Sequence, residues 1–110
     1  MNIVERDEKG VTVYVLEGRI DTQGSVSMDQ ALQSAINQEK YKLILDMTDV
    51  TYISSAALRS LADVLTKSKK AGGDLKLVAL SSKIVRVFRI IGFDKYFSIY
   101  DSVEAAQAAY

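Results

Sequence analysis

The segment 41-YKLILDM-47 is the feature that most restricts how this chain folds. Its middle is almost entirely apolar, whereas a strand with one face in water alternates apolar and polar side chains. A continuous apolar strand is typical of the interior of a parallel sheet, where both faces are covered. The segment therefore predicts an α/β domain, provided that helical segments flank it.

Helical periodicity is present on both sides of this strand. The apolar residues before it recur at helical spacing and predict a helix that ends near residue 37 or 38, namely Met28, Ala31, Leu32, Ala35 and Ile36. The apolar residues after it mark one face of a second helix, namely Leu58, Leu61, Ala62 and Leu65. Gly72 and Gly73 are expected to end that second helix, because glycine adopts left-handed backbone conformations without steric cost.

The N-terminal segment predicts two strands followed by a loop. A short strand begins at Ile3 and Val4, a turn follows at 8–10, and 11-VTVYVLEG-18 has the period-2 pattern of a second strand. The polar stretch 19-RIDTQGS-25 is expected to form a loop before the first helix.

The C-terminal third predicts a strand at 75–80, a third helix, a short edge strand within 93–100 and a last helix. Gly92 is expected to end the third helix, and Asp101 to cap the last one with Glu104 three residues later. The residues expected to point inward from the third helix are Ile84, Val87, Phe88 and Ile91. The order predicts one domain over residues 1–110, with a mixed sheet of four to five strands and about four helices.

Composition excludes several classes of chemistry. The sequence has no histidine and no cysteine, so Ser-His-Asp and Cys-His catalysis are excluded, as are histidine and thiolate metal ligands. No P-loop and no GxGxxG motif is present. We expect no enzymatic activity, no cofactor and no metal.

Charge and hydropathy also limit the kinds of partner that we expect. The chain has 14 basic and 14 acidic residues, which argues against direct binding of nucleic acid. Its N-terminal residues lack the apolar region of a secretory signal, and no apolar run is long enough to span a bilayer. We expect a cytoplasmic protein without membrane insertion.

The stretch 50-VTYISSAALRSL-61 places two adjacent serines where a strand passes into the second helix. Ser54 is suited to be the N-cap, accepting a hydrogen bond from the amide of Ala56 or Ala57. Ser55 then lies at the first helical position, where capping does not need its hydroxyl. One interpretation is that two small residues permit a tight turn.

The other interpretation is that Ser55 accepts a phosphoryl group. A helix N-terminus has free amides and a partial positive charge, so it tolerates a phosphate, which adds about −1.5 to −2 charges. Arg59 lies four residues later and either pairs with that phosphate or is solvated. A partner docked against this turn would be repelled by the modification.

These residues belong to a wider resemblance. The run 46-DMTDVTYISSAALRSL-61 resembles the signature of STAS domains, which occur in bacterial anti-sigma factor antagonists. The stretch 17-EGRID-21 matches that family's Gly-x-hydrophobic-Asp loop, and 86-RVFRIIGFDKYFSIYDSVEAAQAA-109 looks like its C-terminal end. The resemblance covers essentially the whole chain and implies the STAS fold.

The resemblance implies a phosphorylation switch in transcription regulation by partner switching. In that branch the unphosphorylated protein binds an anti-sigma factor that is also a serine kinase, which frees the sigma factor. Phosphorylation of the antagonist releases it, and a PPM-type phosphatase restores it. Carried over by position, the acceptor is Ser55, with Ser54 as the second choice. The implied partner surface comprises Asp21, Thr22, Ser54, Ser55, Ala56 and Arg59, although Asp21 by itself also fits a turn or helix cap.

Two positions depart from the family pattern. Position 54 is usually Asp and position 57 is usually Gly, whereas this chain has Ser54 and Ala57. Ser54 retains capping ability without the negative charge, and the Cβ of Ala57 is expected to stand in the way of a partner's close approach. A STAS protein that does not switch would tolerate both changes.

Two other functions therefore stay open. One is a non-switching STAS scaffold in a stress-signalling or lipid-transport complex. The other is a small-molecule module with an apolar pocket beneath the second and third helices, where Phe93, Tyr96 and Phe97 either form a lid or pack the third helix against the sheet. We expect a monomer or a weak dimer.

Overall fold

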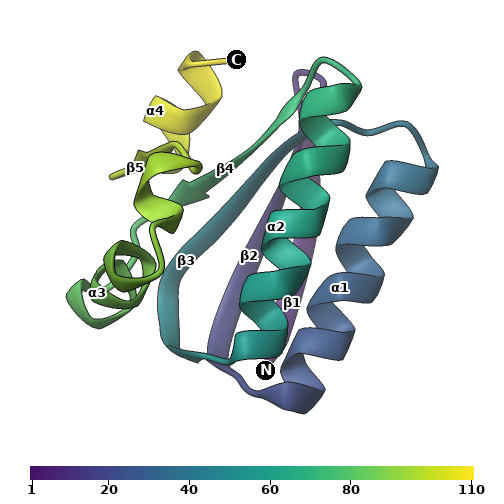
Figure 1. The fold of residues 1–110 in the computed structure, drawn as a ribbon. Helices are drawn as coiled ribbons and strands as arrows, with labels where there is room; N and C mark the ends of the chain where they lie inside the picture. Colours follow the sequence, from purple (N-terminus) through teal and green to yellow (C-terminus); the bar gives the residue numbers. More distant parts are fainter.

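A computed structural model describes all residues, 1–110, as one mixed five-stranded sheet with helices on both faces (Figure 1). The strand order is β1-β2-β3-β4-β5, with β1 and β2 antiparallel and the other neighbours parallel. The strands are β1 (Asn2–Glu8), β2 (Val11–Ile20), β3 (Lys42–Ile53), β4 (Asp74–Val78) and β5 (Ile99–Tyr100). The helices are α1 (Thr22–Asn37), α2 (Ser55–Lys70), α3 (Ser82–Ile90), α4 (Val103–Ala108) and the 3-10 helix η1 (Phe93–Lys95). The predicted α/β class is confirmed.

Strand β3 lies at the centre of the sheet and is covered on both faces. Leu43, Ile44 and Leu45 are all fully buried. Ile44 belongs to the core cluster that includes Ala106 of α4, whereas Leu43 and Leu45 belong to the larger cluster on the opposite face. The apolar run that predicted an interior strand is thereby explained, because successive side chains of a strand enter two different cores.

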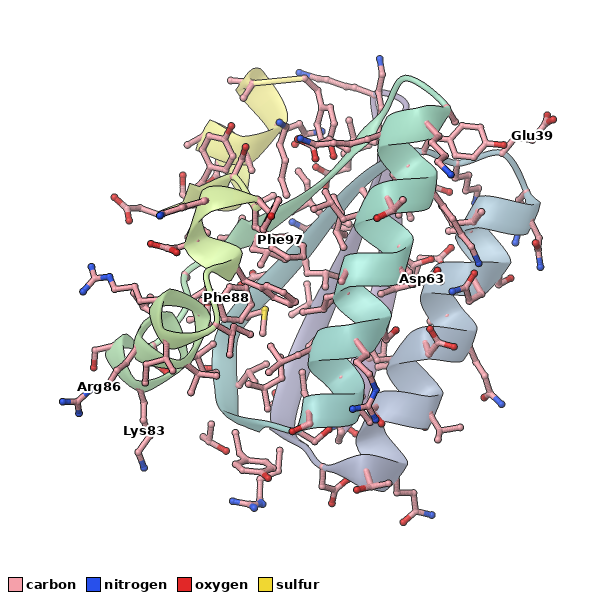
Figure 2. All side chains as sticks on the ribbon, in the orientation of Figure 1. Glu39, Asp63, Lys83, Arg86, Phe88 and Phe97 are labelled. Atoms are coloured by element: carbon pink, nitrogen blue, oxygen red, sulfur yellow. The ribbon has the colours of Figure 1, made fainter.

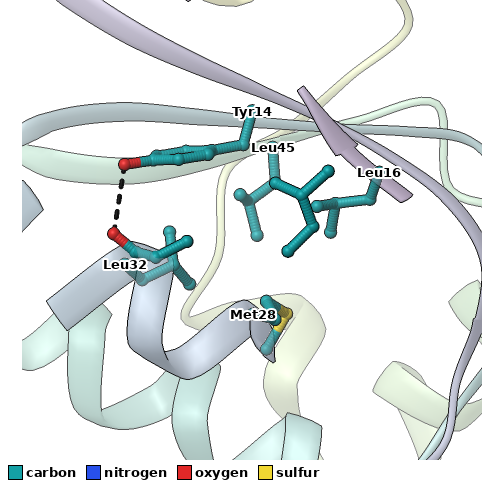
Figure 3. Close-up of a pocket in the computed structure, with 7 residues that line it drawn as sticks. Tyr14, Leu16, Met28, Leu32 and Leu45 are labelled. Atoms are coloured by element: carbon teal, nitrogen blue, oxygen red, sulfur yellow. Dashed lines mark hydrogen bonds between the residues drawn. The ribbon is translucent and has the colours of Figure 1, made fainter. Parts of the chain in front are cut away.

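The larger core lies between the sheet and α1, α2 and α3. Figure 3 shows the part between the sheet and α1, where the Tyr14 side chain reaches toward the helix and its hydroxyl donates to the carbonyl oxygen of Ala31 at 3.1 Å. The lining of this space leaves no room for a water molecule, as expected for a closely packed interior. The lining residues are Ile3, Tyr14, Leu16, Met28, Ala31, Leu32 and Leu45.

The smaller core lies on the opposite face and is closed by the C-terminus. Tyr110 lies after α4, and its hydroxyl contacts the carbonyl oxygens of Leu43 at 2.5 Å and Asp74 at 2.8 Å. Burial raises the pKa of the Tyr110 phenol above its ordinary value. The last residue of the chain therefore bridges β3 and β4.

Three local predictions were wrong. The stretch 19–25 is not a loop, because β2 continues to Ile20 and α1 begins at Thr22, with its first turn built from small polar residues that hide the helical pattern. The cap of α4 is Ser102 rather than Asp101, since the Ser102 hydroxyl accepts from the Ala105 amide at 3.1 Å. Ile91 is 45% exposed, because α3 ends at Ile90 and the chain turns at Gly92, whose φ is +79°.

The predicted aromatic connection packs against α3 and also lines one side of an open groove. Phe93 and Phe97 pack against Phe88 of α3, with ring centroids 6.0 and 5.7 Å apart, whereas Tyr96 is 67% exposed. An open groove of about 220 Å³ separates this segment from α2 and is lined by Ala62, Leu65, Thr66, Phe93, Tyr96 and Phe97. The groove is smaller than the about 300–1,000 Å³ usual for ligand pockets.

No helix of the protein has the length and apolarity needed to cross a membrane.

We predict that Tyr110→Phe lowers the free energy of unfolding by about 1 kcal/mol, because it removes a half-buried donor that contacts both β3 and β4. The measurement is urea denaturation at neutral pH. The matched control is Tyr96→Phe, since Tyr96 is exposed and its hydroxyl has no hydrogen bond within the protein. Equal stabilities of the two variants would show that the C-terminal bridge does not stabilise the fold.

Candidate functional site

The candidate site lies at the carboxyl ends of β2 and β3. These two strands are parallel neighbours, paired up to Ile20 opposite Ile53, and each is separated from the next helix by one residue. The backbone amide of Ser54 donates to the carbonyl oxygen of Ile20 at 2.8 Å. The N-termini of α1 and α2 therefore lie side by side at one edge of the sheet (Figure 1).

The two single-residue connections are both helix caps. The Asp21 carboxylate accepts from the Gly24 amide at 2.7 Å, and the Ser54 hydroxyl accepts from the Ala57 amide at 3.2 Å. Both residues have extended backbone conformations, as N-caps do. The structure thus shows Asp21 and Ser54 in structural roles, and the part of Asp21 in a partner surface stays a prediction.

The two serines of the doublet have different environments. Ser54 is only 7% exposed, and its hydroxyl is engaged in the cap. Ser55, the first residue of α2, is exposed, and its hydroxyl makes no hydrogen bond within the protein. Sequence alone left both hydroxyls as candidates, whereas the tertiary structure leaves one of them accessible.

The other predicted site residues lie around Ser55. Thr22 is exposed at the start of α1, and Ala56 is half-buried on the first turn of α2. Arg59 is exposed one turn after Ser55 and has no carboxylate within 4 Å. Ala57 is fully buried in the main core, so its Cβ does not face a partner and the expected obstruction was wrong.

Sequence reasoning missed a cation–aromatic pair at the same edge. The guanidinium of Arg19 lies 4.3 Å from the ring centroid of Tyr52, which is 42% exposed. The two residues are partners in the register of β2 and β3. Because the segment 19–25 was predicted to be a loop, Arg19 and Tyr52 were not predicted to lie on neighbouring strands. Extending both predicted strands, to Ile20 and to Ile53, would have placed Arg19 beside Tyr52 on neighbouring strands.

A polar network holds α1 against α2. Lys67 contacts the Asp63 carboxylate at 3.1 Å and the Gln33 side-chain oxygen at 3.0 Å, and the Gln33 amide donates to Asp63 at 2.8 Å. Figure 2 shows Asp63 on the side of α2 that faces α1. The hydrogen bonds from Gln33 and Lys67 lower the pKa of Asp63 below its ordinary value. The network joins the C-terminal halves of α1 and α2.

The comparisons with known proteins agree with this architecture. The sequence profile described as "STAS domain" matches residues 2–106. The chain is 32% identical over 95 residues to the anti-sigma-B factor antagonist of Bacillus subtilis, covering 84% of this chain and 85% of that protein. It therefore belongs to the STAS domain family.

Solved structures share the fold over nearly the whole chain. The crystal structure of an anti-sigma factor antagonist from Mycobacterium paratuberculosis has a TM-score of 0.88 and 27% identity, covering 98% of this chain and 92% of that one. SpoIIAA of Bacillus in its phosphorylated form has a TM-score of 0.78 and 15% identity, covering 99% and 100%. The second likeness shows the fold alone.

We predict that Ser54→Ala lowers the free energy of unfolding by about 1 kcal/mol, since the Ala57 amide loses its acceptor at a buried cap. Ser55→Ala is the matched control and is expected to stay within about 0.5 kcal/mol of the original protein, because its hydroxyl has no partner to lose. Urea denaturation measures both. A loss of the same size in Ser55→Ala would mean that both hydroxyls support the fold.

We predict that Asp63→Asn lowers the free energy of unfolding at neutral pH by about 0.2–1 kcal/mol, the range for partly exposed ion pairs. Because the folded pKa of Asp63 is below the unfolded value of about 3.9, the stabilisation is present above that pH and is lost as the pH falls through the folded pKa. Chemical denaturation at several pH values tests this. A difference between the two proteins that persists at the lowest pH would exclude the ionised carboxylate as its source.

Proposed function

We propose that this protein is an anti-sigma factor antagonist whose binding to its partner is switched off by phosphorylation of Ser55. The observation that carries the proposal is the difference in exposure and hydrogen bonding between the two serines. Ser54 is buried and caps α2, whereas the Ser55 hydroxyl is exposed and unbonded on the first turn. A kinase can reach Ser55 without opening the fold.

Local electrostatics support Ser55 as the acceptor. A phosphate there adds about −1.5 to −2 charges beside the free amides of the α2 N-terminus, which favour negative charge. The first turns of α1 and α2 contain no acidic residue, although the Asp21 carboxylate precedes α1. Arg59 has no carboxylate partner and lies one turn away, at the spacing that allows a phosphate–guanidinium contact. A phosphate on Ser54 would instead remove the cap.

The same charge would disrupt a docked partner. The proposed surface comprises Asp21, Thr22, Ser55, Ala56 and Arg59, all exposed or half-buried at one edge of the sheet. A protein that covers this edge would desolvate the new phosphate, which is costly because its charge of about −1.5 to −2 exceeds the single positive charge that Arg59 offers. The modification therefore changes the interface while the sheet and helices stay as they are.

The proposed partner is an anti-sigma factor that is also a serine kinase acting in the cytoplasm. In the transfer, the Ser55 oxygen bonds to the γ-phosphorus of ATP, the bond to the β-phosphate oxygen breaks, and the hydroxyl proton goes to the kinase's base, leaving ADP. A PPM-type phosphatase hydrolyses the ester. The protein is the substrate of this cycle, not its catalyst, and it needs no cofactor or metal of its own.

We predict that the cognate anti-sigma factor kinase and ATP phosphorylate the original protein and Ser54→Ala on Ser55, but do not phosphorylate Ser55→Ala. Mass spectrometry of peptides that contain both serines measures the modification. The purified phosphoprotein is expected to bind the anti-sigma factor at least about tenfold more weakly, a difference of about 1.4 kcal/mol. Isothermal titration calorimetry measures this affinity.

The variants make the outcomes distinguishable. Labelling that persists in Ser55→Ala would move the acceptor to another residue. An anti-sigma factor that binds both forms with equal affinity would remove the switch. A kinase that binds the protein tightly but never labels it would favour the non-switching scaffold.

A further inference from the structure

Helix α3 carries a concentration of positive charge that the balanced composition conceals. Between Asp74 and Asp94 the sequence has four cations and no carboxylate, although the whole chain has 14 residues of each sign. Three of these cations, Lys83, Arg86 and Arg89, are on α3, and the fourth, Lys76, is buried and paired with Asp74 at 3.0 Å. The unpaired charge of the segment is therefore on one helix.

The three cations lie on the face of α3 that points away from the core. Ile84 and Phe88 are buried against the sheet, whereas Lys83, Arg86 and Arg89 are exposed. Figure 2 shows Lys83 and Arg86 projecting outward from the body of the protein. Together with Ser82, the three cations line an open depression of about 580 Å³.

None of these side chains is neutralised within the protein. No carboxylate lies within 4 Å of them, whereas Lys40 and Lys67 have ion-pair partners. The spacing of three residues from Lys83 to Arg86 and from Arg86 to Arg89 places like charges next to each other on the helix surface, where they repel. An external anionic partner would remove this repulsion.

An apolar side chain lies on the same face. Ile90 is 77% exposed and follows Arg86 by four residues, so the two are neighbours on the helix surface. Arginines beside an exposed apolar side chain form the combination that protein interfaces favour at their centres. A phosphate backbone would gain nothing from covering Ile90. The apolar face of α3 is buried in the core and is not available for a bilayer.

We propose that the outward face of α3, formed by Lys83, Arg86, Arg89 and Ile90, binds an acidic segment of a partner protein in which carboxylates flank an apolar side chain. Carboxylates pair with the two guanidinium groups and the ammonium group, and the apolar side chain covers Ile90. This surface lies on a different helix from Ser55, so the proposal does not rest on phosphorylation. Its failure would leave the Ser55 switch intact.

The test uses the unphosphorylated full chain and a short fluorescent peptide of aspartate and glutamate with a central leucine. Fluorescence anisotropy is expected to show binding that weakens as salt increases, because the contacts are exposed charges. The variant Lys83→Gln/Arg86→Gln/Arg89→Gln is expected to lose at least about tenfold in affinity. Ile90→Ser is expected to weaken binding without changing its salt dependence. The matched control is Lys69→Gln/Lys70→Gln, which removes two exposed cations of α2.

Four results with the peptides and variants would each overturn the proposal. These are no binding of the acidic peptide, equal losses in the α3 and α2 variants, equal binding of a peptide with asparagine and glutamine in place of the acids, and an unchanged affinity in Ile90→Ser. Phosphatidylserine vesicles and duplex DNA are compared at the same salt concentration. If the protein binds the vesicles or the DNA more strongly than the acidic peptide, and the α3 variant loses that binding, this face would be assigned to a membrane or to nucleic acid instead.

Discussion

The parallel pairing of β2 with β3 is the constraint on which the site depends. Because Ile20 and Ile53 are register partners and each is followed by one capping residue, α1 and α2 begin side by side. The hydrogen bond from the Ser54 amide to the Ile20 carbonyl joins the two connections directly. A shift of this register would separate the helix N-termini and, with them, the predicted partner surface.

This arrangement separates a structural task from a regulatory one. Capping occupies Ser54, which is buried, and leaves the neighbouring hydroxyl of Ser55 exposed. Under the proposed function, a phosphate added to Ser55 alters the charge of the surface without removing any hydrogen bond of the fold. A second surface, the basic face of α3, would contribute binding that does not respond to that phosphate, so recognition and switching would be carried by different helices.

Much of the architecture was predictable because its signals are local. The apolar strand at 41–47, the helical spacing of Leu58, Leu61 and Leu65, and the capping ability of Ser54 each depend on neighbouring residues. The structure confirms all three, although β3 continues beyond the predicted end of the strand to Ile53. The stretch 19–25 was predicted as a loop because small polar residues form the first turn of α1, where capping rather than hydrophobic periodicity defines the helix.

The sequence by itself determined the fold class, the order of the elements and the pair of serines at the start of α2, since these follow from propensity and periodicity along the chain. Only the tertiary structure decided which serine is exposed, that Arg19 stacks on Tyr52, and that Ala57 faces the core. Each of these depends on the register between strands or on the side of a helix that packs inward. Such relations join residues that are distant in the sequence, and no local pattern specifies them.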